Sequence, residues 1–180
     1  MPMLHHEPLY VVERSISQGG RNESQSVSVA DISTFVAALP IGPRAAWWEE
    51  MHCESVIREL SELPDGWDGY GALSIGESTA AHAVIAIRQL CNVTRAPEIV
   101  PNSNGTLSLL WDTPEGRAHL EIGETRFSFY VRPAQGMSIF LDGAAGNIPP
   151  FAGKLISAHL YPHLNVLQTL TNISFARNDA

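Results

Sequence analysis

The segment from Leu63 to Ala72, Leu-Pro-Asp-Gly-Trp-Asp-Gly-Tyr-Gly-Ala, constrains the fold more than any other part of the chain. Its three glycines lose much backbone entropy on ordering, so they are expected where the backbone takes a positive φ or passes close to another element. Pro64 ends a helix that arrives from the N-terminal side. Because a second helix-like stretch follows, the segment predicts an ordered loop between two helices.

The residues on both sides of this loop recur with helical spacing. The first helix is predicted from about Pro43 to Leu63, and its apolar face consists of Cys53, Val56, Ile57, Leu60 and Leu63, enlarged near its start by Trp47, Trp48 and Met51. The second helix is predicted to begin at Ser74, whose hydroxyl forms a capping box with Glu77. It continues to Cys91, and we expect it to be largely buried along a stripe of Ala80, Ala83, Val84, Ile87, Leu90 and Cys91.

A change of the apolar period from 3.6 to 2 after Pro97 predicts a run of half-buried strands. The strands are predicted over 98–101, 106–112, 117–122 and 126–132, with a fifth over 137–141 and a last helix over 151–160. The side chains predicted to face the core are Leu107, Leu109, Trp111, Ala118, Leu120, Ile122, Phe127, Phe129 and Val131. The fold class is therefore α+β: two helices joined by a Gly-rich loop, packed on one face of a four- to five-stranded antiparallel sheet, with an additional C-terminal helix.

The composition divides the chain into three parts. Residues 44–165 are predicted to form a single α+β domain. Residues 1–43 are predicted to be a partly flexible N-terminal extension, with a short strand over 9–12, a polar loop over 15–28 and a short helix over 31–39. Residues 166–180 are predicted to be a C-terminal tail.

The chain is acidic, with a formal net charge of −8 that arises from 19 carboxylates against 11 lysines and arginines. Such a surface repels phosphate backbones, so nucleic-acid binding is disfavoured, and it suits a basic protein partner. No apolar run has the length of a membrane span, and residues 1–10 lack the pattern of a signal peptide, so we expect a cytoplasmic protein without membrane contact. Cys53 and Cys91 are expected to be small buried side chains.

The loop admits two interpretations. In the first, Asp65 and Asp68 accept hydrogen bonds from nearby backbone amides, Trp67 packs between the helices and the sheet, and Tyr70 buries its ring. In the second, Asp65 and Asp68 are acid–base groups or ligands of a hard metal ion, with Tyr70 nearby in the same cleft. The first interpretation is favoured because local capping explains the same residue types. In it, the structural motif consists of Gly66, Trp67, Gly69 and Gly71.

Two further surfaces are candidate binding sites. Adjacent helical positions differ by about 100°, so at most one of Trp47 and Trp48 points fully inward, and the other forms a protein-contact hot spot beside Glu49 and Glu50. Partial cover of the sheet or of the N-terminal extension is the other interpretation, and it is favoured because tryptophan is mostly buried in folded proteins. The second surface is the sheet face opposite the core, where alternation places His119 and Tyr130. Its other predicted members are Ser108, Leu110, Glu121 and Ser128, with Arg117, Arg126 and Arg132 at the strand ends.

The sequence contains no complete catalytic constellation. His52 neighbours Cys53 on a helix, where adjacent side chains diverge, and Pro162 interrupts the pair of His159 and His163. Motifs for phosphate binding, dinucleotide binding, a nucleophile elbow or a zinc site are absent. We therefore predict no catalytic residue, no metal and no cofactor.

The decapeptide 63–72, followed by a second helix and a strand such as Pro97 to Pro101, resembles a group of bacterial, phage and mobile-element proteins that share the motif Leu-Pro-x-Gly-Trp-Asp-Gly-Tyr-Gly-Ala. The resemblance covers residues 50–132 and implies an accessory role in toxin–antitoxin, immunity or phage systems, without a reaction common to the group. We accordingly predict a non-enzymatic protein-binding factor, antitoxin-like or phage- or immunity-associated, that neutralises or regulates a partner protein. The alternative is a small-ligand-binding protein or an enzyme that uses a cleft around the Asp65–Tyr70 loop.

Overall fold

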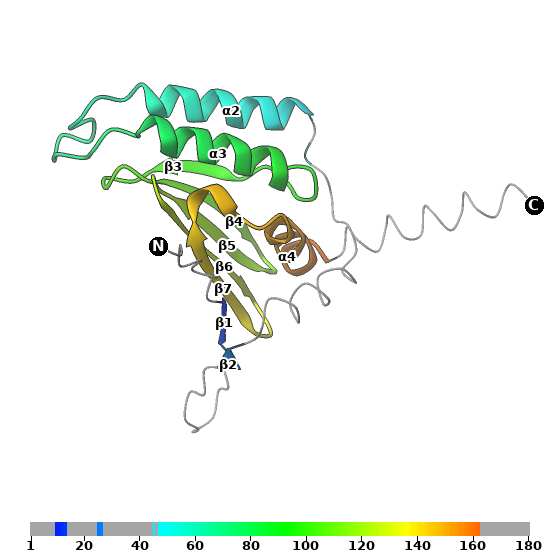
Figure 1. Cartoon of the computed structure of the whole chain (residues 1–180). Helices are drawn as coiled ribbons and strands as arrows, with labels where there is room; N and C mark the ends of the chain where they lie inside the picture. The colour runs from blue at the N-terminus through cyan, green and yellow to red at the C-terminus, as the bar shows by residue number, and fades with distance from the viewer. Residues whose placement is uncertain (1–9, 14–24, 27–44, 46, 163–180) are drawn as a thin grey trace, which may run out of the picture.

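The protein is built on one antiparallel sheet with helices against one of its faces (Figure 1). The computed structural model describes residues 10–13, 25–26, 45 and 47–162. Within these residues the strand order is β2-β1-β7-β6-β5-β4-β3. α3 (Glu77–Leu90) and α4 (Phe151–Leu160) pack on the sheet, and α2 (Trp47–Ser61) packs against α3 and the edge strand β3. This arrangement confirms the predicted α+β class.

The five predicted strands are all present. They are β3 (Glu98–Pro101), β4 (Leu107–Thr113), β5 (Gly116–Ile122), β6 (Arg126–Pro133) and β7 (Ser138–Ala144). Their bounds agree with the predicted ones to within one residue except at the end of β7, which continues because Ala144 still pairs with Arg126 of β6. A short 3₁₀ turn, η1 (Ala145–Asn147), leads toward α4, whose predicted bounds are confirmed.

Two strands from the segment that we predict as an N-terminal extension continue this sheet. β1 (Tyr10–Glu13) pairs with β7, and β2 (Gln25–Ser26) pairs with β1. The strand expected over 9–12 is thus present, and β2 lies inside the segment that we predict as a loop. The helix predicted over 31–39 and the tail predicted over 166–180 fall outside the described residues.

The core lies between the helices and one face of the sheet. Every second residue of β4, β5 and β6 is buried there, as the period of two predicts. From the helices, Ile57, Ile87, Leu155 and Ile156 complete the same cluster, and Cys53 and Cys91 are buried within it as expected. α3 is amphipathic rather than largely buried, because Ile85 and Arg88 face solvent.

Both predicted helix starts are wrong in detail. α3 begins at Glu77 with Gly76 as its N-cap, and no side chain caps it. The expected capping box is absent because both the amide and the hydroxyl of Ser74 donate to Asp65 instead. Trp47, Trp48 and Met51 do not enlarge the apolar face of α2. That face runs along Cys53 and Ile57, and at about 100° per residue the three large side chains lie toward solvent.

The core assignment predicts a sharp difference between two leucine truncations. Leu120 is fully buried in the middle of β5, whereas Leu73 is exposed beside the Gly-rich loop. Leu120→Ala should lower the free energy of unfolding by about 2–5 kcal/mol because it leaves a cavity. The matched Leu73→Ala should change it by about 0.5 kcal/mol or less. Urea melts of both variants measure this, and equal losses would contradict the assignment of the buried face.

Candidate functional site

The Gly-rich loop between α2 and α3 is held by its own backbone. Gly66, Gly69 and Gly71 have φ values of 75°, 78° and 94°, a region that suits glycine. The Gly66 amide donates to the Ala72 carbonyl across 2.6 Å, and the Gly69 amide donates to the Gly66 carbonyl across 2.8 Å. The prediction that these glycines are needed for positive φ is therefore confirmed.

Both acids of the loop are occupied by backbone amides. Asp68 Oδ1 accepts from the amides of Tyr70 at 2.7 Å and Ala72 at 3.0 Å. Asp65 Oδ1 accepts from the Ser74 amide at 2.8 Å. These hydrogen bonds hold the pKa of each carboxyl below its ordinary value, because they stabilise the ionised form. The carboxylates therefore serve as local caps, as the first interpretation predicts.

The two rings of the loop lie differently from the prediction. Trp67 is half-buried and is not part of the core cluster, and its Nε1 donates to the Leu73 carbonyl across 3.3 Å. Tyr70 is 96% exposed at the tip of the loop. The prediction that both rings are buried is wrong, because the loop extends beyond the ends of the two helices (Figure 1).

The far end of the loop is fastened to the sheet. The Leu73 amide donates to the Ser103 carbonyl in the turn between β3 and β4, across 2.8 Å. A Cβ on Gly105 of the same turn would come within 3.1 Å of the Ser74 carbonyl oxygen. This close approach requires glycine at position 105, and it fixes where the chain enters α3.

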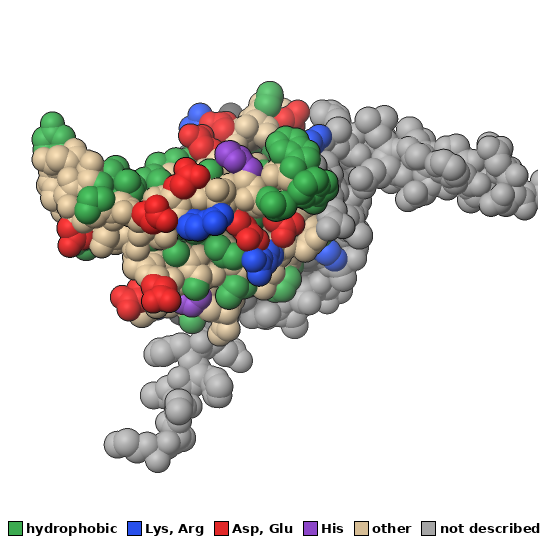
Figure 2. Space-filling model, turned by 90° about the horizontal axis from the view of Figure 1, so that it is seen from above, with side chains coloured by type: hydrophobic (Ala, Val, Ile, Leu, Met, Phe, Trp, Pro, Cys, Tyr) green, Lys and Arg blue, Asp and Glu red, His purple; other side chains and the backbone are tan. Residues whose placement is uncertain are grey.

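The first turn of α2 carries an apolar patch that consists of Trp47, Trp48 and Met51. Their exposed fractions are 72%, 58% and 61%. Figure 2 looks down on α2 and α3 and shows hydrophobic side chains beside acidic ones on this side of the molecule. Large apolar side chains are usually buried in folded proteins, so three exposed ones over residues 47–51 make this patch a candidate contact surface.

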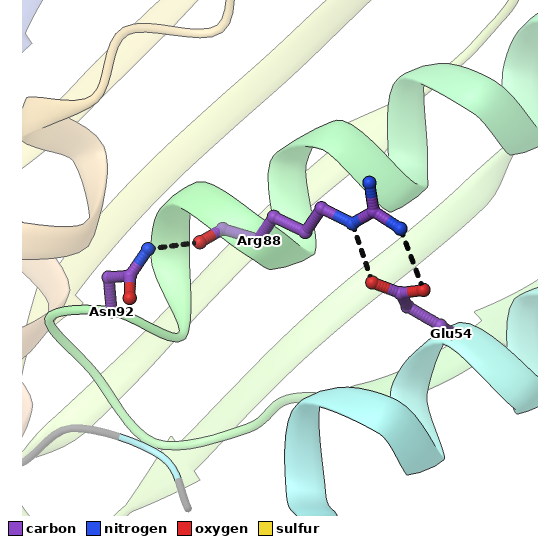
Figure 3. Close-up of polar contacts among 3 residues, drawn as sticks. All are labelled: Glu54, Arg88 and Asn92. Carbon is purple, nitrogen blue, oxygen red and sulfur yellow. Dashed lines mark hydrogen bonds and ion pairs between the residues drawn. The ribbon is translucent and has the colours of Figure 1, made fainter. Parts of the chain in front are cut away.

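Charged side chains surround this patch. α2 carries Glu49, Glu50, Glu54 and Glu59 against one base, Arg58. Glu54 forms a two-pronged ion pair with Arg88 of α3, from Nε to Oε1 at 2.6 Å and from the second guanidinium nitrogen to Oε2 at 3.0 Å (Figure 3). The Arg88 carbonyl in turn accepts from the Asn92 side chain. The pair ties the outer sides of α2 and α3 together and leaves the acidic character of α2 dominant.

The sheet face opposite the helices carries the second predicted surface. His119, Tyr130 and Phe140 lie opposite one another on β5, β6 and β7. The rings of His119 and Tyr130 meet edge to face with centroids 5.4 Å apart, and the Arg132 guanidinium lies over Tyr130. The predicted outward orientation of His119 and Tyr130 is confirmed. Both are half-buried by their neighbours rather than fully exposed.

Sequence reasoning missed that His119 has a partner. Its Nε2 lies 2.9 Å from Ser108 Oγ on β4, and Asn102 donates to the same hydroxyl. Burial lowers the pKa of His119, which favours the neutral imidazole. The pairing register of β4 and β5 creates this contact, because Leu110 lies opposite His119 and Ser108 lies diagonally to it. The sequence signal that could have revealed this contact is the tight turn at Pro114–Glu115, because that turn sets the register of the two strands.

The pair of Ser108 and His119 is not arranged for nucleophilic catalysis. Ser108 is buried, and the β4 amides around it belong to the ladders with β3 and β5, so they offer no oxyanion hole. The nearby carboxylate of Glu121 accepts from the Thr106 hydroxyl at 2.8 Å. These groups form a polar network across the strands. Beside it lies a groove of about 470 Å³ lined by Thr106, Glu121, Gly123, Glu124, Thr125, Arg126, Phe127, Ser128 and Asp142.

Within the described part of the chain, no group of three or more His, Cys, Asp or Glu side chains is placed to hold a metal ion. In that same part, no helix combines the length and the apolar character that crossing a membrane requires.

No family model matches the chain, and no curated protein or solved structure matches it. The resemblance based on residues 63–72 therefore stays a prediction.

The hydrogen bonds of Asp65 and Asp68 predict a pH dependence of stability. Because the folded state lowers both pKa values, their stabilisation is present above the unfolded-state pKa of about 4 and is lost as the pH falls through the folded values. Asp68→Asn keeps the shape and an acceptor oxygen but removes the charge. We expect its melting temperature to fall less than that of the wild type between pH 5 and about pH 2, measured by circular dichroism. Parallel curves would contradict the capping role.

Proposed function

We propose that the chain is a non-enzymatic protein-binding factor that neutralises or regulates a partner protein through the apolar patch of Trp47, Trp48 and Met51. The single observation that carries the proposal is the exposure of these three side chains within the first turns of α2. Tryptophan is the residue type most enriched in binding hot spots, since it contributes a large apolar area with few rotatable bonds. A buried, well-ordered core beneath α2 keeps the patch in one geometry.

The charge of the helix supports a basic partner. Four glutamates on α2 and a net charge of −8 for the chain create a negative potential around the patch. A complementary positive surface would raise the association rate and select against acidic competitors. An antitoxin-like, phage- or immunity-associated role fits such a basic target, and this part of the proposal rests on the resemblance of residues 63–72.

The alternative of a small-ligand site or enzyme around Asp65–Tyr70 has less support. Asp68 already accepts two backbone hydrogen bonds and Asp65 accepts one, and the Tyr70 side chain is exposed to solvent. A ligand there would have to displace the contacts that shape the loop. The groove near Glu121 and Asp142 involves other residues and does not include the loop.

The proposal predicts where a partner cross-links. A photoreactive benzoylphenylalanine is placed in turn at Trp48, Tyr70 and Tyr130, which sample the α2 patch, the loop tip and the open sheet face. After irradiation of cells that express the chain with its genomic neighbours, position 48 should give a defined protein adduct. Adducts only at position 70 or 130, or none at position 48, would contradict the proposal.

Purified complexes give the energetic test. The double variant Trp47→Ala/Trp48→Ala should weaken binding of the cross-linked partner by about 100-fold or more, since each hot-spot tryptophan contributes about 2 kcal/mol. The matched control Ile85→Ala truncates an exposed apolar side chain of α3 and should change the dissociation constant by less than about threefold. Because all three side chains are exposed, melting temperatures should stay close to that of the wild type. Calorimetric titration measures the affinities, and equal effects would overturn the assignment.

A further inference from the structure

The Gly-rich loop has a defined shape that packing against the domain does not explain. Beyond its immediate neighbours in the chain, a Cβ added to Gly66, Gly69 or Gly71 would meet no atom of the described residues within 4 Å. Trp67 lies outside the core cluster, and its indole donates to a carbonyl at the end of the same loop. The conformation of the loop is therefore set by its own hydrogen bonds and by the positive φ of its glycines.

These hydrogen bonds close the loop on either side of its tip. The Gly66 amide donates to the Ala72 carbonyl, and Asp68 accepts the amides of Tyr70 and Ala72. Ala72 is itself buried, and Ile75 just beyond it belongs to the core cluster. The loop thus holds Tyr70 in one position relative to the domain.

The ordered loop presents a single exposed aromatic ring. Tyr70 is 96% exposed, and Figure 2 shows the loop as a projection at the left edge of the molecule. A tyrosine supplies a large contact area with few rotatable bonds, and tyrosines are enriched in binding hot spots. Because the loop is already ordered, binding through this ring does not require the entropy loss of ordering a flexible segment.

The charge around this ring is negative. Residues 59–87 contain no lysine or arginine, and their carboxylates belong to Glu59, Glu62, Asp65, Asp68 and Glu77. The projecting end in Figure 2 likewise carries hydrophobic and acidic side chains and no basic one. A receiving surface with basic side chains would be complementary to it, which is the charge preference that the glutamates of α2 also impose.

We propose that Tyr70 inserts into an apolar pocket, rimmed by basic side chains, on the same partner protein that contacts the α2 patch. This second contact rests on the proposed function, because it belongs to the same complex. α2 has 15 residues and is about 22 Å long at 1.5 Å per residue, so both contacts fit within one interface of ordinary size. Figure 2 shows hydrophobic side chains near both ends of α2 on one side of the molecule.

The shape of the loop is tested without a partner. Chymotrypsin cleaves after an exposed tyrosine where the backbone can open locally, and mass spectrometry of the native full-length chain measures cleavage between Tyr70 and Gly71. Asp68→Ala removes the acceptor of two loop hydrogen bonds, so it should be cleaved there at least about tenfold faster than the wild type. Equal rates would show that the wild-type loop is not preformed and would overturn the inference.

The insertion of the ring is tested with the purified partner that cross-links at position 48. Tyr70→Ala should weaken binding of this partner by about 30-fold or more in calorimetric titration. The matched variant Tyr70→Phe retains the ring and should change the dissociation constant by less than about threefold. Asp68→Ala retains the tyrosine but loosens the loop, and it should weaken binding by about tenfold or more.

The outcomes separate this inference from the proposed function. Wild-type affinity of Tyr70→Ala, with weak binding of Trp47→Ala/Trp48→Ala, would overturn the insertion of Tyr70 and leave the α2 patch as the contact. Weak binding of Tyr70→Ala alone would support the insertion and contradict the α2 patch. Wild-type affinity of Asp68→Ala would overturn the need for a preformed loop. Absence of any adduct at position 48 would overturn both proposals.

Discussion

The arrangement of the helices depends on hydrogen bonds at the Gly-rich loop, in which backbone amides donate to the carboxylates of Asp65 and Asp68. Asp68 receives two backbone amides of the turn that contains it, and Asp65 receives Ser74 at the entrance to α3. These contacts fix how α2 turns back onto α3, and the bond from Leu73 to Ser103 fixes how the pair sits on the sheet. Side chains of α2, α3, α4 and one sheet face share a single core. The hydrogen bonds of the loop and of Leu73 therefore also fix the position of α2.

Once α2 is placed in this way, its outer surface is determined. Cys53 and Ile57 face inward, and the helical period then directs Trp47, Trp48 and Met51 toward solvent. One carboxylate oxygen of each loop acid accepts backbone amides, and the Ser108–His119 pair belongs to a polar network across the strands. For these reasons we propose binding through α2, where the ion pair of Glu54 with Arg88 lies beside the patch.

Much of the fold could be predicted from the sequence because it depends on local period and turn chemistry. The strands β3 to β6 and helix α4 follow apolar alternation, helical spacing and breakers such as Pro101, Gly123 and Pro150. The loop glycines and the capping role of Asp65 and Asp68 were predicted for the same reason, since each involves neighbours in sequence. Within the described residues, α2 and α3 begin or end up to several residues from their predicted bounds, where hydrogen bonds with distant residues decide the outcome.

The remaining features required tertiary geometry. The capping box at Ser74 failed because Asp65, nine positions earlier, competes for the same groups. The inward placement of Trp67 failed because the loop extends beyond the helix ends, and composition does not reveal that extension. The contact of Ser108 with His119 depends on the pairing register of β4 and β5. The tight turn between these strands indicates that register only indirectly, because the turn has to be recognised before the residues can be paired.

The most direct test of the central claim is the solvent exposure of the four tryptophans in solution. With 5-fluorotryptophan incorporated and each resonance assigned by a Trp→Phe variant, fluorine NMR in H₂O and D₂O measures this exposure residue by residue. Large solvent-isotope shifts are predicted for Trp47 and Trp48, a smaller one for the half-buried Trp67 and almost none for the buried Trp111. Small shifts at both Trp47 and Trp48 in the free protein would mean that the α2 patch is covered, and would contradict the account.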